Sequence, residues 1–453
     1  MTRFVRKIQV KPTSHHQHGK CSFARAIVPR SHSQTCCPVI RKVPARSRIV
    51  LGTQYSMSSS KNVNAGSGAG AGAHAAGDTA PLRWEVESSF ATLCGFASRR
   101  VTVEALAVRP CSTEPIAVVG QGSVAYALNA DTGKVIARLQ QPSAVSSVAF
   151  SADGRVVAIA CSSAVQVHTC GGDWTELAVV KSGGHATTEG EPSRTILSAS
   201  VSADGRRLAV LVAERLGGML SQPVMLLDLS SCGNPLELSL ADSSPVLDDD
   251  RERSQLEGVC ISFSPADNNL LAVAGTHADL LCVDVSTAPG RVCNRFVDHR
   301  DTKLWHVHLQ AGFQSRKVLA FSPSGDRLAW CGDNVLRTME VRGRGSGASV
   351  RLLMERTVSD FGSSYPVSSA SFSAAHPLVV CGSLAHDSCV IPLHGGDEIA
   401  LRLRSEYSAV TGVGFLPDRQ NTIRFVACLK NGAIIVWAAV KPVRLYFACV
   451  YRR

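Results

Sequence analysis

The chain has 453 residues, of which 45% are hydrophobic, 18% charged and 6% aromatic, a composition that can bury a core and argues against wholesale disorder. The formal net charge is +11, and residues 1–80 carry all of it, because they hold 12 Lys and Arg against the single acid Asp78. Residues 81–453 have no net charge, because they hold 35 basic and 35 acidic side chains. Nucleic acid is therefore not expected as a partner of the folded part.

Two further classes of protein are disfavoured early. No run of 18 or more apolar residues is present, so no integral membrane segment is expected. The 16 cysteines include no C-x-x-C pair, which argues against structural zinc and thioredoxin-like chemistry. Most lie in apolar runs, where Cys behaves as a small hydrophobe. These features indicate a reducing compartment, cytoplasmic or nuclear.

Residues 1–80 are predicted to be a disordered basic and Gly/Ala-rich tail. Residues 1–56 contain no acidic residue, and two interpretations are open for them. They are either a mitochondrial transit peptide or an extension that precedes a start at Met57. Residues 62–77 are almost entirely Gly, Ala and Asn, and such a segment buries too little to offset the ordering of its backbone.

A repeat governs residues 84–453. Apolar runs with the character of a first strand recur at intervals of 42 to 62 residues, and they end at Val108, Phe150, Val201, Phe263, Phe321, Phe372 and Phe415. Each is followed by a small polar turn and by further apolar runs. The shortest interval is about the length of one four-stranded propeller blade. The spacing therefore predicts seven such units.

The turns and the strands support this prediction. Ser151-Ala152-Asp153-Gly154-Arg155 and Ser202-Ala203-Asp204-Gly205-Arg206 fall at the same phase of successive units, and Asp-Gly supplies the positive φ of a tight hairpin. Runs such as Val156–Cys161 are apolar on both faces, which a strand between two neighbouring sheets requires. We therefore expect an all-β fold: a seven-bladed β-propeller of four-stranded antiparallel sheets.

The repeat resembles the WD-repeat β-propeller family. Gln121–Lys134 is similar to the third strand and following turn of that family, and Asn431–Trp437 is similar to the third strand of its final blade. The Trp-Asp ending survives only in part, as Leu227-Asp228, Val283-Asp284 and Val436-Trp437-Ala438, so the resemblance is to a divergent member. It covers about residues 95–450. It implies rigid faces whose loops bind peptides or other protein subunits.

The strand that closes the ring is left open by the sequence. Residues 443–451 could supply the fourth strand of the last blade, in which case Trp84 to Phe90 would be an extra outer strand or lie across the surface. Members of the family usually close the ring with an N-terminal strand instead, and Trp84 to Phe90 would then take that place.

Two polar segments are the candidate protein-interaction sites. Asp248, Asp249 and Asp250, followed by Arg251, form an acidic loop tip suited to a basic partner. Trp305, His306 and His308 place an aromatic side chain beside two imidazoles that share one face of a strand. Neither segment has the full ligand set of a metal site. The basic run Val341–Gly347 is interpreted as a hairpin insertion.

The leading hypothesis is a non-enzymatic interaction scaffold, a WD-repeat-like subunit of a multiprotein complex. No catalytic residue, metal ligand or cofactor site is predicted, because no motif for phosphate, nucleophile or zinc chemistry occurs in a fitting context. One alternative is a propeller enzyme with a metal site in its central channel, of hydrolase or lactonase type. Another is a guanine-nucleotide exchange factor for a small GTPase in vesicle formation at the endoplasmic reticulum.

Overall fold

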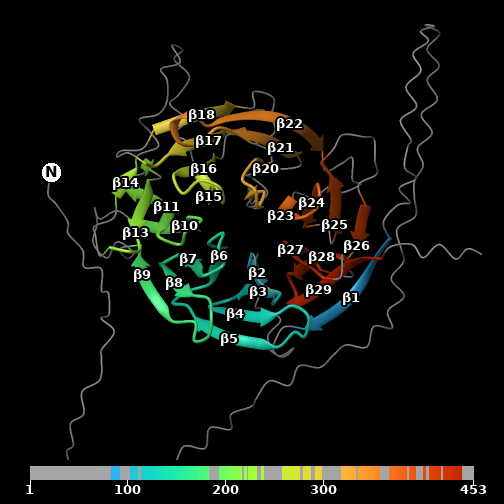
Figure 1. Cartoon of the computed structure of the whole chain (residues 1–453). Helices are drawn as coiled ribbons and strands as arrows, with labels where there is room; N and C mark the ends of the chain where they lie inside the picture. Colours follow the sequence, from blue (N-terminus) through green and yellow to red (C-terminus); the bar gives the residue numbers. More distant parts are fainter. Residues whose placement is uncertain are drawn as a thin grey trace, which may run out of the picture.

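The computed structural model describes seventeen stretches of the chain. They are residues 83–91, 103–110, 114–182, 193–216, 219–221, 223–231, 236–238, 258–275, 279–286, 291–297, 318–332, 335–357, 367–384, 387–393, 401–404, 408–419 and 422–440. Within them the strands form seven antiparallel sheets arranged around a common axis, as the prediction required (Figure 1). The chain is a seven-bladed β-propeller.

The blades follow one another in chain order, and each runs from an inner first strand to an outer fourth strand. Blade 1 consists of β2 (Val103–Val108), β3 (Ile116–Gln121), β4 (Val124–Asn129) and β5 (Val135–Gln140). Blade 2 consists of β6 (Val145–Phe150), β7 (Val156–Cys161), β8 (Ala164–Thr169) and β9 (Glu176–Lys181). Blade 3 consists of β10 (Ser193–Val201), β11 (Arg207–Leu216), β13 (Val224–Asp228) and β14 (Leu236–Leu238).

The same order continues through the second half. Blade 4 consists of β15 (Gly258–Phe263), β16 (Leu270–Gly275), β17 (Asp279–Asp284) and β18 (Arg291–Val297). Blade 5 consists of β19 (Val318–Phe321), β20 (Arg327–Gly332), β21 (Val335–Arg342) and β22 (Ser349–Thr357), with the 3-10 turn η2 (Gly345–Gly347) before β22. Blade 6 consists of β23 (Val367–Phe372), β24 (Leu378–Ser383), β25 (Asp387–Pro392) and β26 (Leu401–Arg404). Blade 7 begins with β27 (Val410–Arg419), β28 (Thr422–Leu429) and β29 (Ala433–Val440).

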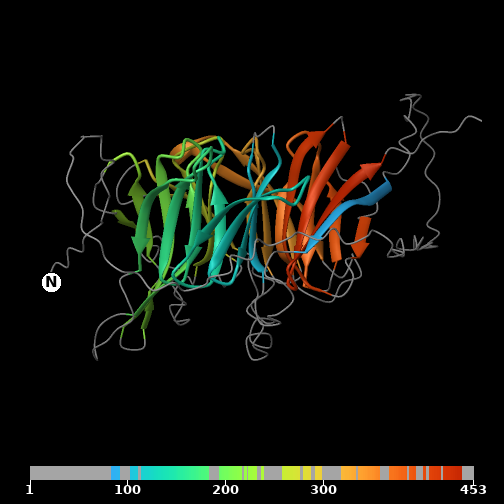
Figure 2. The ribbon, with the colours of Figure 1, turned by 90° about the horizontal axis from the view of Figure 1, so that it is seen from below.

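The last blade is completed by a strand from the start of the folded region. β1 (Arg83–Ala91) pairs antiparallel with β29, from Arg83 opposite Val440 to Ala91 opposite Ala433. In both views β1 lies along the outer side of the final blade (Figures 1 and 2). β1 therefore occupies the place of the fourth strand of blade 7, and the alternative in which residues 443–451 supply that strand is not adopted. Residues 443–451 themselves lie outside the described residues.

The predicted strand ends are confirmed at six of the seven first strands. β2, β6, β10, β15, β19 and β23 end at the residues expected from the repeat. β27 instead continues past Phe415 to Arg419, where it pairs with Thr422 at the start of β28. Blade 3 also departs from the four-stranded pattern, because β11 extends into a hairpin with the additional short strand β12 (Met219–Ser221).

The buried apolar side chains of the described residues form seven clusters, and each cluster lies between two consecutive blades. β7 shows why, since all six of its residues are buried: Ala158 packs toward blade 3, while its neighbours Val157 and Ile159 pack toward blade 1. A sheet with two apolar faces cannot exist alone in water, so each blade is stabilised only by its neighbours. This makes closure of the ring part of the stability of every blade.

Candidate interaction surfaces

Strand direction alternates within each blade, which gives the disc two distinct faces (Figure 2). The turns from the first to the second strand and from the third to the fourth strand lie on one face, here called the turn face. The turns from the second to the third strand, and the connections from one blade to the next, lie on the other, here called the connection face. Any inserted connection between blades must start and finish at the connection face.

Both predicted interaction segments belong to connections of this kind. Asp248, Asp249, Asp250 and Arg251 lie between β14 and β15, and Trp305, His306 and His308 lie between β18 and β19. All seven residues are outside the described part of the chain. The flanking strand ends at Leu238, Gly258, Val297 and Val318 belong to neighbouring blades and the same face.

The turn face is built on a serine that opens most of its first-to-second turns. Ser202 is fully buried, and its hydroxyl donates to Oδ1 of Asp204 at 2.6 Å and accepts the backbone N–H of Arg207 at 2.9 Å. Ser151 makes the same pair of bonds in blade 2, to Asp153 and from Val156. The serine hydroxyl thus takes the place of a backbone carbonyl as the acceptor for the N–H of Arg207 or Val156.

The glycines in these turns have the conformation that the Asp-Gly motif predicts. Gly154 and Gly205 have φ of 68° and 72°, and Gly325 has 73° in the related Ser-Gly-Asp turn of blade 5. A side chain at Gly205 would also meet Val156 Cγ2 at 2.9 Å, in the neighbouring blade. The motif therefore shapes the hairpin and lets adjacent turns approach each other.

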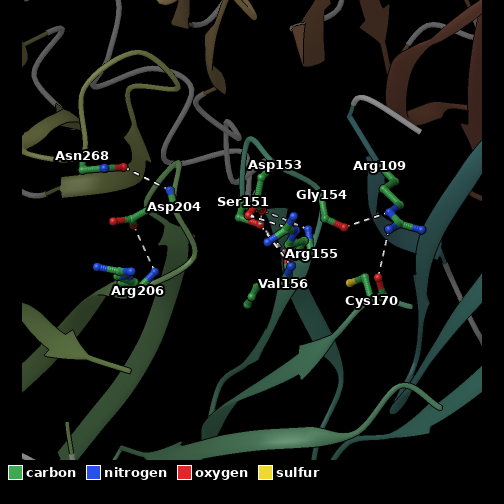
Figure 3. Close-up of polar contacts among 10 residues, drawn as sticks. All are labelled: Arg109, Ser151, Asp153, Gly154, Arg155, Val156, Cys170, Asp204, Arg206 and Asn268. Atoms are coloured by element: carbon green, nitrogen blue, oxygen red, sulfur yellow. Dashed lines mark hydrogen bonds and ion pairs between the residues drawn. The ribbon is translucent and has the colours of Figure 1, made fainter. Parts of the chain in front are cut away.

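Neighbouring turns on the turn face are joined by polar contacts, and Figure 3 shows those that link blade 1 to blade 2 and blade 3 to blade 4. Between blades 1 and 2, Arg109 donates from Nε to the Gly154 carbonyl at 2.8 Å and from Nη2 to the Cys170 carbonyl at 2.9 Å. Between blades 2 and 3, the Asp153 N–H donates to the Ala203 carbonyl at 3.3 Å. Each contact uses a turn residue whose side chain or backbone reaches the next blade.

The contacts continue on the far side of blade 3. The N–H of Asp204 donates to Oδ1 of Asn268 in blade 4 at 3.1 Å. Asp267 in blade 4 in turn accepts the N–H of Gly345 from η2 of blade 5 at 2.8 Å. The basic run Val341–Gly347 is therefore the third-to-fourth hairpin of blade 5, as interpreted from the sequence, and it rests on blade 4. His376 in blade 6 reaches Asp418 in blade 7 at 3.1 Å.

The inner strands are linked by a second set of hydroxyl groups. The N–H of Phe263 in blade 4 donates to Oγ of Ser200 in blade 3 at 2.9 Å, and the N–H of Phe415 in blade 7 donates to Oγ of Ser371 in blade 6 at 3.2 Å. These N–H groups lie on the inner edge of a sheet, where no further strand can pair with them. Serine in the inner strands satisfies them and ties consecutive blades together.

The junction between blade 7 and blade 1 contains a buried arginine. Arg424 on β28 is 2% exposed, and it donates from Nε to Oε2 of Glu87 on β1 at 2.6 Å and from Nη2 to Oδ1 of Asp131 in blade 1. Burial lowers the pKa of the guanidinium, but the bonds and charges of the two carboxylates outweigh it, so the pKa is raised overall. Arg419 adds a second contact to Asp131 at 3.4 Å.

Arg424 was not singled out by sequence analysis, although a signal was present. It lies in the run Thr422–Leu429, whose other residues are apolar except for the terminal Thr. A charged residue in a strand that is apolar on both faces must have a partner of opposite charge, because an unpaired buried charge is too costly. Glu87 and Asp131 could not be assigned to it, since they are far away in sequence.

A second buried arginine lies inside blade 5. Arg337 is 2% exposed, its guanidinium carbon lies 5.0 Å from the ring centroid of Trp330, and its Nε donates to Oε2 of Glu355 on β22 at 3.2 Å. The aromatic face and the carboxylate together offset the cost of burying the charge. The side chain of Glu355 is itself 32% exposed, so this ion pair links the buried arginine to the surface of the blade.

On the connection face, blades 1 and 2 bring together three serines and a thiol. Ser143 Oγ lies 3.1 Å from Oγ of Ser162 and 3.2 Å from Oγ of Ser163, and the thiol of Cys161 lies 3.7 Å from Oγ of Ser163. Burial raises the pKa of this thiol, and hydrogen bonds from Ser143, Ser163 and Ala164 outweigh it, so the pKa is lowered. Cys161 is nevertheless fully buried.

The described part of the chain contains no group of three or more His, Cys, Asp or Glu residues placed to hold a metal ion. Within the same part, no helix has the length and hydropathy of a membrane span. The eight cysteines whose side chains the structure describes are free thiols, and all of these but Cys260 are buried. This agrees with their interpretation as small hydrophobes in the strands.

Comparison with known proteins supports the propeller fold but does not assign the chain to a family. No family model matches the chain, and no curated protein matches it in sequence. Among solved structures, the chain is similar to the Cps50 (Swd1) β-propeller domain of Myceliophteria thermophila, with a TM-score of 0.57 and 14% sequence identity. The match covers 76% of this chain and 98% of that domain. At this identity the likeness shows a shared propeller architecture alone.

Proposed function

We propose that this chain is a non-enzymatic interaction scaffold of the WD-repeat type, a subunit that holds other proteins on its faces. One observation carries the proposal. The blade-to-blade connections begin and end on the connection face, while the blades are held together on the turn face by contacts between neighbouring turns. Such a molecule presents connections of different lengths from a platform held together by contacts between its blades, which is the arrangement a scaffold needs.

The charge distribution supports the same proposal. The neutral balance of the folded region makes a nucleic-acid ligand a poor fit, whereas proteins and peptides impose no such requirement. The proposed contacts are the acidic segment Asp248–Arg251 and the segment that contains Trp305, His306 and His308, two parts of connections whose flanking strands end at the connection face. A carboxylate cluster suits a basic partner, and tryptophan is enriched among the residues that dominate binding energy.

The test is affinity purification of the full chain from a native extract, followed by measurement of the mass of the purified assembly in solution. A partner in a fixed stoichiometry is expected. The triple variant Asp248→Asn, Asp249→Asn, Asp250→Asn and the single variant Trp305→Ala should each weaken its retention, whereas Arg155→Ala on the exposed turn face should not. A chain that is purified alone, at the mass of one copy, would contradict the proposal.

A further inference from the structure

The fourth strand of blade 5 is an extended edge of the ring. β22 has nine residues, as does the closing strand β1, whereas β18 has seven, β5 and β9 have six each, β26 has four and β14 has three. Among the described residues it pairs with β21 alone, and it lies on the outer rim (Figure 1). An outer strand of this length can accept another strand through its backbone.

Two adjacent leucines are exposed on this edge. Leu352 and Leu353 are 36% and 46% exposed, and a β-bulge in the pairing with β21 falls at this point. The other large exposed hydrophobic side chains among the described residues, Ile136 and Leu177, occur singly on β5 and β9. A single exposed apolar residue is ordinary, but an adjacent pair on an edge strand offers a partner apolar area to cover.

The same edge carries more basic than acidic side chains, with four arginines and two glutamates in residues 340–356. Arg344, in the hairpin that leads into β22, and Arg351, near the start of the strand, are both exposed. Neither forms an ion pair with another described residue. Glu340 lies opposite Arg351 in the pairing of β21 with β22, but its carboxylate pairs with Arg342 at 2.8 Å. The nearest carboxylate along the strand, that of Glu355, is bound to the buried Arg337. A segment that pairs with β22 therefore meets two arginines and favours acidic side chains.

A bulge and charged residues on an edge strand also prevent uncontrolled pairing between copies of a protein. That role is compatible with selective pairing. The arginines on this edge repel a basic strand and attract an acidic one. The same residues can therefore prevent pairing with a basic segment and favour pairing with an acidic segment.

We propose that β22 is a docking edge that accepts an extended acidic segment of a partner protein as a fifth strand of blade 5. Backbone hydrogen bonds of strand addition hold the segment, its apolar side chains cover Leu352 and Leu353, and its carboxylates pair with Arg344 and Arg351. This inference rests on the scaffold function proposed above and adds to it a second surface, on the circumference, with a stated partner chemistry.

The test uses the full chain and two synthetic peptides of about ten residues, one alternating valine with glutamate and one alternating valine with lysine. Binding is measured by fluorescence anisotropy, and hydrogen exchange locates the bound peptide. The glutamate peptide is expected to bind and to slow the exchange of β22 amides. The double variant Arg344→Glu, Arg351→Glu should weaken it by about tenfold or more and bind the lysine peptide instead. Leu352→Ser with Leu353→Ser should weaken both interactions.

The matched control is Ile136→Ser with Arg138→Glu on β5, which changes an equally exposed apolar side chain and an exposed arginine on another outer strand. It should leave binding unchanged. Equal binding of the glutamate peptide to the wild type and the Arg344/Arg351 variant would overturn the proposal, and so would protection located on another strand. Self-association of the chain that these variants abolish would also overturn it, because the occupant would then be a second copy. A stoichiometric partner that the Arg344/Arg351 variant retains would leave the scaffold function intact while rejecting this docking edge.

Discussion

Nε of Arg424 lies 2.6 Å from Oε2 of Glu87, although the two residues are 337 positions apart in the chain. Glu87 belongs to β1, the strand that completes the last blade, and Arg424 also binds Asp131 in the first blade. One guanidinium therefore joins the closing strand, blade 7 and blade 1. Closure of the ring depends on β1 both through its backbone pairing and through this charge contact.

Removal of the carboxylates is expected to destabilise the fold more than removal of the arginine. Glu87→Gln with Asp131→Asn leaves a buried guanidinium without counter-charge, which costs about 3 kcal/mol, whereas Arg424→Met leaves two partly exposed carboxylates that water can solvate. Urea unfolding of both variants and the wild type gives the comparison. A larger loss in Arg424→Met would show that the arginine acts mainly through packing.

The approach of blade 1 to blade 7 depends on two glycines in β27. A Cβ at Gly412 would lie 2.5 Å from Cβ of Leu106, and a Cβ at Gly414 would lie 2.5 Å from Cγ2 of Val108. Gly412→Ala is expected to destabilise the fold by about 1–3 kcal/mol, because the two inner strands must separate. Thermal unfolding measures this. Gly171→Ala is the control, since nothing lies within 4 Å of that position, and an equal loss there would refute the packing argument.

Ser202 is expected to stabilise its turn through both of its hydrogen bonds. Ser202→Ala leaves the N–H of Arg207 without its hydroxyl acceptor, and the expected cost is about 1–2 kcal/mol. Burial raises the pKa of Asp204, but the bond from Ser202 is the largest of the contributions that bring it below the usual range. The variant should therefore also raise the pKa of Asp204, which an NMR titration detects. Ser230→Ala, at an exposed serine that donates to Asp228 at 2.6 Å, should cost less than about 0.5 kcal/mol.

Mild acid should destabilise the fold through His168. Burial lowers the pKa of this imidazole, while the backbone of Trp174 and the charge of Glu176 act in the opposite sense without cancelling it. Below the ordinary histidine pKa of about 6.5, the unfolded chain takes up a proton that the folded chain refuses, so stability falls as the pH drops through this range toward the folded pKa. Above it both states are neutral and the residue contributes no pH dependence.

The corresponding experiment compares wild type with His168→Gln by urea unfolding at about pH 7 and about pH 5. The wild type should lose more stability between the two than the variant does. The lowered pKa values of Asp204 and Asp326 act only at more acidic pH, below the usual carboxyl range, so they do not contribute to this difference. An identical loss of unfolding free energy in the two proteins would show that the acid sensitivity arises from groups other than His168.

Local pattern was enough to predict the blades. The alternation of apolar runs with Ser-Ala-Asp-Gly turns predicted seven sheets and the ends of six first strands, because strand propensity, turn geometry and two-sided burial are all properties of short segments. The third strands of the first and last blades, β4 and β29, also lie where the resemblance placed them.

Only the tertiary structure decided how the blades are joined. The choice of β1 as the closing strand, the contact of Arg109 with Gly154, and the burial of Arg424 between Glu87 and Asp131 all link positions distant in sequence. Such pairings depend on which surfaces meet once the ring has formed, and no short segment encodes that. The sequence by itself determined the strands and turns of each blade. The three-dimensional arrangement determined which residues link the last blade to the first, because those contacts form only when the blades are packed side by side in the ring.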